Sequence, residues 1–551
     1  MLIVIVLLAA FLRFYKVDKV PVSLYWDETA SAYNAFSIAQ TGKDEYGTSF
    51  PLMFRSFEDY KMPGSIYLTA LSTKIFGLNE FSARFSSGLA GVLTVLVTYF
   101  LVIEICKFFP DYLKEKKINP LHLALLSTFL LTISPWHLQF SRTGFEANVG
   151  LFFVVFGTCL FLKGLQKQRY YFVAMTIFAL SFYFYRSIHI FLPIFLCCLF
   201  VIFRNDLFTL IKKRNVYMGI VILVVLSLPI LKESFSQNGL RRVNQVSIFT
   251  LANSEVYDLV ITANQAGYQN LNNIFYNRRY VFFQKIVDNY LAHLGPRFLF
   301  IKGDSNGRHG VIGMGLQYIW EIPFLLFGVV MLSNVRSKIK YVIFSWILIA
   351  PIASALSIPS PHALRALNMV PPLEILAALG ILRIIARISG KKKVIFCLFL
   401  LGIIMFFFAR YLFLYYIVTS EQRNKDWADG YKQLTTYVFD NENKYDKVII
   451  SGYNWQPYIY FLFYKKYDPA LFQKYGSKKG FDKYLFGGTS WDKEQYSLSL
   501  EGVNLREFGK GKKILVALSP DEYKAQINNI NTITEIKDSN GNVVFAIGDI
   551  K

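Results

Sequence analysis

Two adjacent carboxylates, Asp27 and Glu28, come shortly after an apolar segment at the start of the chain and are well suited to acid–base chemistry. On a helix they would point about 100° apart, so one could face a cavity while the other orients it. The alternative is a plain helix start, because acidic residues favour the N-terminal turn. In the same loop Pro63 could begin a helix, and Lys61 could contact a phosphate or simply extend to lipid head groups. These residues predict a site that deprotonates one substrate and holds the phosphate of another.

A second set of polar side chains lies at the ends of later apolar runs. Arg142 and Glu146 are spaced i and i+4, so in a helical turn they would pair, whereas a functional Glu146 would be a second acid in the cavity of Asp27. Cations at a membrane surface commonly contact lipid phosphate. The candidates here, besides Lys61, are Arg142, Arg186, His362 and Arg365. The aromatic residues expected to bind substrate are Tyr33, Tyr60 and Tyr185.

The glycine-rich segments and the cysteines indicate no cofactor. Residues 302–310 are polar and glycine-rich, which fits a mobile lid or a plain loop, but their spacing matches neither a Walker nor a dinucleotide motif. The five cysteines lie inside or at the ends of apolar runs without metal-site spacing. We therefore expect no disulfide framework and no structural zinc.

The composition shows what kind of framework must position these groups. Of 551 residues, 54% are hydrophobic and only 17% are charged, a balance typical of a protein with many membrane spans. The net charge of +22 could indicate nucleic acid binding, but the basic residues cluster in short loops between apolar runs. That distribution is typical of membrane topology and argues against a nucleic acid partner.

Membrane spans of about 20 apolar residues can be read along the chain. Eleven candidates lie near residues 1–14, 82–106, 120–138, 147–165, 170–185, 188–203, 216–232, 316–333, 341–357, 368–387 and 394–417. The first is short and could be a signal peptide, but no small-residue cleavage site precedes Asp27, which favours a retained helix. Five basic loops, at 107–117, 163–169, 204–214, 336–340 and 383–393, are expected to face the cytoplasm.

With this orientation, every polar cluster described above falls on the outer side. The long outer segments are 15–80, 233–315 and the tail from 421. Residues 28–40 and 64–76 have helical spacing and predict short helices on the membrane surface. The tail, 421–551, contains strand-like stretches at 447–451, 513–517 and 543–547. We expect an α-helical polytopic membrane domain, 1–420, followed by a small extracytoplasmic α/β domain, 421–551.

The order of these motifs resembles the GT-C superfamily of membrane glycosyltransferases. The resemblance is to the branch of protein O-mannosyltransferases and the lipid A aminoarabinose transferase. That branch carries an Asp-Glu pair after the first span, matched by Asp27-Glu28, and then a Lys-Pro-Pro-like element, matched by Lys61-Met62-Pro63. Met62 departs from this pattern. Pro135-Trp136-His137 with Ser141-Arg142 is also similar to the segment that closes the third span of the family.

The resemblance implies a sugar donor carried on a polyprenyl phosphate and inverting transfer to a hydroxyl acceptor of a protein, lipid or glycan. Asp27 would be the general base, supported by Glu28, and Glu146 would bind acceptor or sugar. Lys61, with cations such as Arg142, Arg186 and Arg365, would neutralise the departing lipid phosphate. Some relatives use a divalent metal, but no spacing supports a site between Asp27 and Glu146, so no metal or other cofactor is expected. The expected location is the plasma (inner) membrane.

Three other functions remain open from the sequence. A polysaccharide ligase or polymerase would share the outer cations but use a lipid-linked oligosaccharide. A transporter or flippase would also have many spans, although such proteins usually bind substrate near the middle of the membrane and often contain internal repeats. A structural membrane protein could use the tail to bind a partner. We rank the glycosyltransferase first because the polar residues gather on one side.

Overall fold

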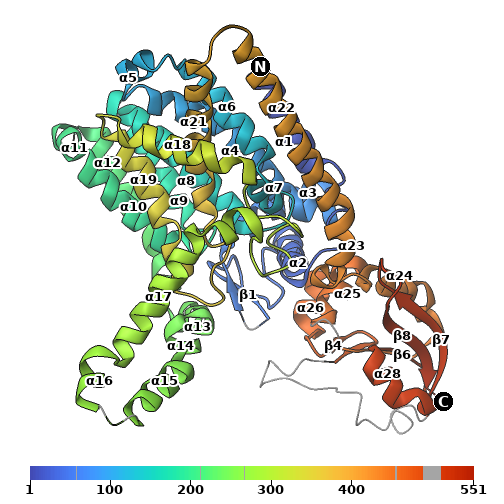
Figure 1. The fold of residues 1–551 in the computed structure, drawn as a ribbon. Coiled ribbons are helices and arrows are strands. Elements are labelled where there is room, and N and C mark those ends of the chain that lie inside the picture. The colour runs from blue at the N-terminus through green and yellow to red at the C-terminus, as the bar shows by residue number, and fades with distance from the viewer. Residues whose placement is uncertain are drawn as a thin grey trace. The chain divides into compact units, whose positions relative to one another are not determined.

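The computed structural model describes residues 1–57, 59–210, 213–265, 267, 269–452, 456–487 and 511–550. Residues 211 and 212, in the third predicted cytoplasmic loop, lie outside this part. The chain forms two compact units, and Figure 1 labels their helices and strands. Unit 1 contains Met1–Tyr15 and Ser87–Leu414, and unit 2 contains Lys16–Ser86 and Tyr415–Lys551. The structure therefore groups the first outer segment with the tail, whereas the division expected at residue 420 places it with the membrane domain.

Unit 1 is helical. Its first half contains α1 (Leu2–Phe14), most of α4 (Glu80–Cys106), α5 (Pro110–Glu115), α6 (Pro120–Ile133), α7 (Pro135–Ser141), α8 (Glu146–Gln166), α9 (Arg169–Ser181), α10 (Ile188–Ile202), α11 (Arg204–Leu210) and α12 (Arg214–Ser234). The segment after α12 forms α13 (Gln237–Val246), α14 (Ile248–Leu251), α15 (Asn253–Gln265), α16 (Gln269–Phe275) and α17 (Arg278–Leu294). The last helices are α18 (Ile322–Ser333), α19 (Ile339–Ile349), α20 (Ile352–Ala355), α21 (Val370–Arg387) and α22 (Gly390–Phe413).

Within the described residues, five helical segments are long and apolar enough to cross a membrane. They are Glu80–Cys106, Glu146–Gln166, Arg214–Ser234, Leu367–Arg387 and Gly390–Gln422. The number rises to seven if the bent pairs α6/α7 and α10/α11 each form one span. The α6/α7 pair bends by 59° at Ser134, because the residue before Pro135 is disfavoured from helical geometry. Other predicted spans form shorter helices, so the protein is a multi-pass membrane protein and the number of about eleven spans stays a prediction.

Helices α18 and α21 cross at very close range inside unit 1. A Cβ atom on Gly380 would lie 2.0 Å from the Phe324 carbonyl oxygen, and one on Gly328 would lie 2.0 Å from that of Leu376. Only glycine allows two helix backbones to approach this closely, as in many membrane helix pairs. The two glycines therefore fix the packing of these helices.

Unit 2 combines the first outer segment with an α/β domain. The outer segment forms α2 (Trp26–Thr41), the hairpin of β1 (Phe54–Ser56) and β2 (Asp59–Lys61), and α3 (Pro63–Phe76). The two predicted surface helices are thus present as helices α2 and α3. The tail forms α23 (Ser420–Gln422), α24 (Tyr431–Asn441), β3 (Lys447–Ile450), α25 (Pro457–Lys465), α26 (Pro469–Tyr475), β4 (Gly480–Phe481), β5 (Tyr484–Phe486), β6 (Ile514–Leu518), α28 (Pro520–Gln526), β7 (Ile530–Lys537) and β8 (Val543–Ile550).

The tail strands make one six-stranded sheet in the order β4-β5-β3-β6-β8-β7. Strand β3 pairs in parallel with β5 and β6, and the other pairs are antiparallel. The three stretches predicted as strands are β3, β6 and β8, which are neighbours in the sheet interior. Part of the tail, residues 488–510, lies outside the described residues.

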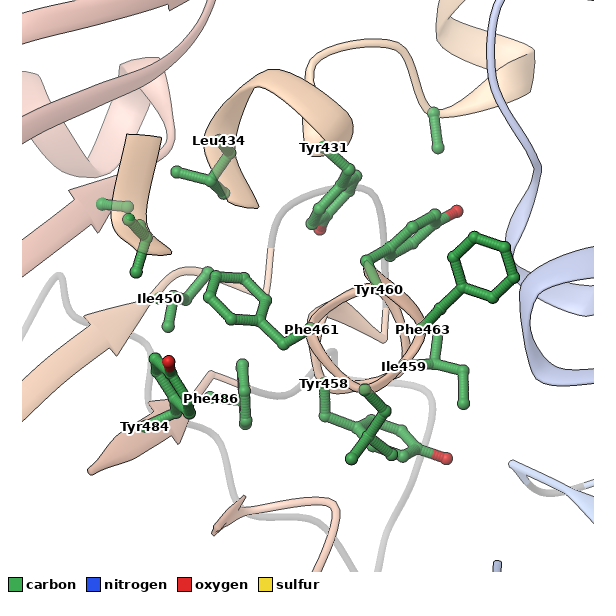
Figure 2. Close-up of a cluster of buried hydrophobic side chains, with 14 of the residues drawn as sticks. Tyr431, Leu434, Ile450, Tyr458, Ile459, Tyr460, Phe461, Phe463, Tyr484 and Phe486 are labelled. Atoms are coloured by element: carbon green, nitrogen blue, oxygen red, sulfur yellow. The ribbon is translucent and has the colours of Figure 1, made fainter. Parts of the chain in front are cut away.

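An aromatic core explains why the outer segment packs with the tail. Figure 2 shows the side chains of α25 directed toward α24 on one side and toward the sheet on the other. Tyr460 of α25 stacks on Tyr431 of α24 with ring centroids 4.2 Å apart. The same buried cluster includes Leu24 and Tyr33 of the outer segment. The Tyr460 hydroxyl also donates to the Leu24 carbonyl oxygen at 3.2 Å, so the core of unit 2 requires both parts of the chain.

Candidate functional site

Asp27 and Lys61 form an ion pair in unit 2. The Lys61 Nζ atom lies 3.1 Å from Asp27 Oδ1 and 3.0 Å from Asp59 Oδ2. The β1/β2 hairpin ends at Lys61, and Pro63 begins α3 immediately afterwards, as the sequence predicts. Asp27 lies in the first turn of α2 and remains 26% exposed, while Lys61 is 16% exposed. A carboxylate and an ammonium group, both partly exposed, therefore meet in unit 2.

Glu28 points the other way, into a buried ion pair. Arg84 Nε donates to Glu28 Oε1 at 3.1 Å and a terminal nitrogen of Arg84 donates to Oε2 at 3.2 Å, with both side chains fully buried. The Tyr25 backbone N–H also donates to Glu28 at 3.4 Å, as part of a capping box at the start of α2. Glu28 thus anchors the turn that carries Asp27.

Arg84 also holds the chain that leads into α2. Its guanidinium donates to the carbonyl oxygens of Val17 at 2.8 Å, Pro21 at 3.1 Å and Ser23 at 2.6 Å. The ring of Trp427 covers the guanidinium at 5.7 Å. Because all of these groups are buried, they fix the backbone before Asp27 more firmly than surface contacts would.

The two tyrosines predicted in this segment differ in environment. Tyr60 is half-buried next to Lys61, and its backbone N–H donates to Asp59 Oδ1 at 2.7 Å. Tyr33 is fully buried in the aromatic core, and its hydroxyl donates to the Tyr467 carbonyl oxygen at 3.1 Å. Tyr33 therefore serves packing rather than substrate contact, because helical spacing from Asp27 turns its side chain toward the core.

The other predicted residues belong to unit 1, where Arg142 caps the C-terminal end of α1. It is 1% exposed and donates to the carbonyl oxygens of Leu12 at 2.5 Å and Tyr15 at 2.9 Å. These are carbonyls that the end of a helix leaves unsatisfied. Helix α7 ends at Ser141 and α8 begins at Glu146, so the i, i+4 argument for a shared helical face does not hold.

The remaining predicted arginines lie in two loops of unit 1. Arg186, next to the half-buried Tyr185, donates to the Gly239 carbonyl oxygen at 2.9 Å. Arg365 donates to Ser357 Oγ at 2.8 Å and to the Pro359 carbonyl oxygen at 3.1 Å. The meeting of these cations with Asp27 and Lys61 of unit 2 in one cavity stays a prediction.

A cluster in unit 1 joins the polar segment 302–310 to His362. Asp304 Oδ2 accepts from His309 Nδ1 at 3.0 Å and from the Ala363 N–H at 2.7 Å. The rings of His309 and His362 have centroids 4.6 Å apart. Burial alone would raise the pKa of Asp304, but the hydrogen bonds from His309 and backbone N–H groups hold it below its ordinary value. Burial lowers the pKa of His309, which Asp304 only partly offsets.

Sequence reasoning did not single out three of these partners. Asp59 is two residues before Lys61, and positions i and i+2 share one face of a strand. A strand assigned to this segment would therefore have predicted the Asp59–Lys61 pair. Asp304 and His309 lie in a segment that was interpreted as a lid or a plain loop. No local spacing connects that segment with His362, which is more than 50 residues away along the chain.

Comparisons with known proteins agree with this architecture. Residues 61–232 match the family model described as dolichyl-phosphate-mannose-protein mannosyltransferase. No curated protein matches the chain in sequence. ArnT from Cupriavidus metallidurans bound to undecaprenyl phosphate has a TM-score of 0.56 at 12% identity, over 99% of this chain and 97% of that chain.

A second, more distant structure has the same fold. The Archaeoglobus fulgidus oligosaccharyltransferase in complex with Zn and sulfate gives a TM-score of 0.52 at 14% identity, over 99% of this chain and 72% of that chain. These low identities establish a common fold, whereas the family model matches the sequence itself. The family match over residues 61–232 and the fold shared with ArnT support the resemblance to the GT-C superfamily of membrane glycosyltransferases.

Proposed function

We propose that the protein transfers a sugar from a polyprenyl-phosphate donor to a hydroxyl acceptor on the extracytoplasmic side of the plasma (inner) membrane, with inversion at the anomeric carbon. The family matched by residues 61–232 is described by a dolichyl-phosphate-mannose donor. ArnT, which shares the fold, binds undecaprenyl phosphate. Both support a lipid phosphate as the carrier of the sugar, and the basic loops support an outer position for unit 2.

The observation that carries the mechanism is the Asp27–Lys61 ion pair. In the proposed step the acceptor oxygen attacks the anomeric carbon while its proton passes to Asp27. The bond between that carbon and the phosphate oxygen breaks, and the lipid phosphate leaves with the electron pair. Lys61 donates to the phosphate and stabilises the developing charge. A donor phosphate at Lys61 would also compete with Asp27 for the ammonium group, which leaves the carboxylate available as the base.

The surrounding residues have supporting roles in this proposal. Glu28, held by Arg84, orients Asp27 without contacting substrate. Tyr60, next to Lys61, contacts the substrate in this proposal. The roles of Tyr185, Arg186 and Arg365 of unit 1 in binding substrate and phosphate stay predictions from the sequence. Glu146, in the first turn of α8, binds the acceptor or the sugar. Arg142 is assigned to the end of α1 because its guanidinium is used there.

The test compares two substitutions in the full chain reconstituted in lipid vesicles. The donor is undecaprenyl-phosphate mannose, a cell-envelope fraction supplies acceptors, and the released undecaprenyl phosphate is measured. Asp27→Asn should reduce transfer about 10²- to 10⁴-fold, the usual contribution of a general base, and leave donor binding intact. Lys61→Met should weaken donor binding as well. Asp18→Asn, an exposed acid of the same outer segment, is the matched control.

Retained transfer by Asp27→Asn would refute the assignment of the base. Vesicles that bind undecaprenyl phosphate but use only a lipid-linked oligosaccharide would instead support the ligase or polymerase. Movement of the intact donor across the vesicle membrane without transfer would support the flippase.

A further inference from the structure

Three potential metal ligands converge in unit 1. Asp304 and His309 belong to the polar segment 302–310, and His362 belongs to the turn between α20 and α21. One ligand atom of each residue lies within 4.8 Å of the other two. The Asp304 carboxylate is fully buried, and His309 and His362 are 4% and 6% exposed. One carboxylate and two imidazoles from separate segments form a donor set that suits Zn²⁺.

The ligands are held by a second layer of contacts. Asp304 accepts from the Asn306 N–H at 2.9 Å and from the Ala363 N–H at 2.7 Å. The His362 backbone N–H donates at 3.1 Å to Nε2 of His293, which in turn donates through Nδ1 to the Asn289 carbonyl oxygen. Such outer contacts orient metal ligands and keep a site organised before the ion arrives.

Aromatic packing restricts His309 further. Its ring lies 5.5 Å from both Phe140 and Phe145, and 4.6 Å from the His362 ring. The ring is therefore held in place beside the other two ligands.

The plain alternative is an Asp–His hydrogen bond that fastens one loop. The 3.0 Å contact between Asp304 Oδ2 and His309 Nδ1 is consistent with such a bond. Two atoms at this separation can also both bind one Zn²⁺, at about 2.0–2.2 Å each, once the shared proton leaves. The hydrogen bond joins only Asp304 and His309, whereas a metal would bind all three converging residues.

We propose that Asp304, His309 and His362 form a Zn²⁺ site that joins segment 302–310 to the turn carrying Arg365. The ion would bind the buried carboxylate and both imidazoles as part of a fixed structure, with a fourth position open to water. The site would thereby hold the backbone from which Arg365 projects. Only that consequence for Arg365 rests on the proposed function; the metal site itself does not.

The test measures metal content in the full-length protein, purified in detergent without a polyhistidine tag. After incubation with Zn²⁺ and removal of excess ion, the native protein should retain stoichiometric zinc by mass spectrometry. His309→Ala and His362→Phe should lose it, whereas His362→Cys should retain it because a thiolate also binds zinc. His122→Ala is the matched control, since His122 is exposed and lies outside the cluster.

Two results would overturn the proposal. One is a native protein without stoichiometric zinc, and the other is equal zinc retention by the native protein, His309→Ala and His362→Phe. If His309→Ala fails to fold, the contrast between His362→Cys and His362→Phe still decides the question, and Co²⁺ absorption of the native protein reports directly on ligand geometry. Because none of these measurements uses sugar transfer, their failure is distinguishable from failure of the proposed enzyme activity.

Discussion

Asp27 and Glu28 form ion pairs that differ in burial, and this difference leads to a quantitative prediction. Glu28→Gln removes the charge that balances a fully buried Arg84 guanidinium. Breaking a buried ion pair by removing one partner costs about 3–5 kcal/mol, because the other charge stays buried without compensation. Asp27→Asn breaks a pair whose side chains are 26% and 16% exposed, which should cost only about 0–1 kcal/mol. The two neighbouring carboxylates should therefore differ strongly in their effect on stability.

The assay is thermal unfolding in detergent, followed by tryptophan fluorescence, because Trp427 lies over the Arg84 guanidinium. For a unit of this size, 1 kcal/mol corresponds to a shift in Tm of about 2–4 °C. Glu28→Gln should thus lower the Tm of unit 2 by about 6–20 °C, and Asp27→Asn by no more than about 4 °C.

Arg84→Lys provides an intermediate case, because lysine keeps the charge but cannot donate to both Glu28 oxygens and to three carbonyl groups. Its Tm should lie between those of the native protein and Glu28→Gln. The reasoning is wrong if Glu28→Gln melts within about 2 °C of the native protein, or if Asp27→Asn is equally destabilised.

Two further predictions concern stability in each unit. Burial raises the pKa of Glu45 to about 7 despite a hydrogen bond from Asn34. The folded state therefore binds more protons than the unfolded state between about pH 4.5 and 7. The free energy of unfolding falls as pH rises through this window, by about 3 kcal/mol in total. Glu45→Gln should therefore raise Tm relative to the native protein more at pH 8 than at pH 5, and a difference independent of pH would contradict this. In unit 1, Gly380→Ala places a Cβ 2.0 Å from the Phe324 carbonyl oxygen and should lower Tm by several degrees. Gly402→Ala is the control and should leave Tm unchanged, because the space around Gly402 is open. Equal Tm values for the two variants would contradict the close crossing of α18 and α21.

The sequence by itself determined the membrane class, the helices of the first outer segment and the central strands of the tail. These features depend on local patterns: long apolar runs, helical spacing after Glu28 and Pro63, and short apolar stretches between polar ones. The closeness of Asp27 and Lys61 also agrees with their prediction as partners within the first outer segment.

Only the tertiary structure decided which of two neighbouring acids is exposed and which is buried. Arg84 is 56 residues after Glu28, and no local spacing indicates that its guanidinium would fill the space behind α2. For the same reason the sequence did not show that Tyr33 belongs to a core completed by the tail. The convergence of His362 with Asp304 and His309 likewise depends on helix packing between distant segments. Periodicity specifies which face of an element is apolar, but the partner that covers that face is set by the packing of the whole chain.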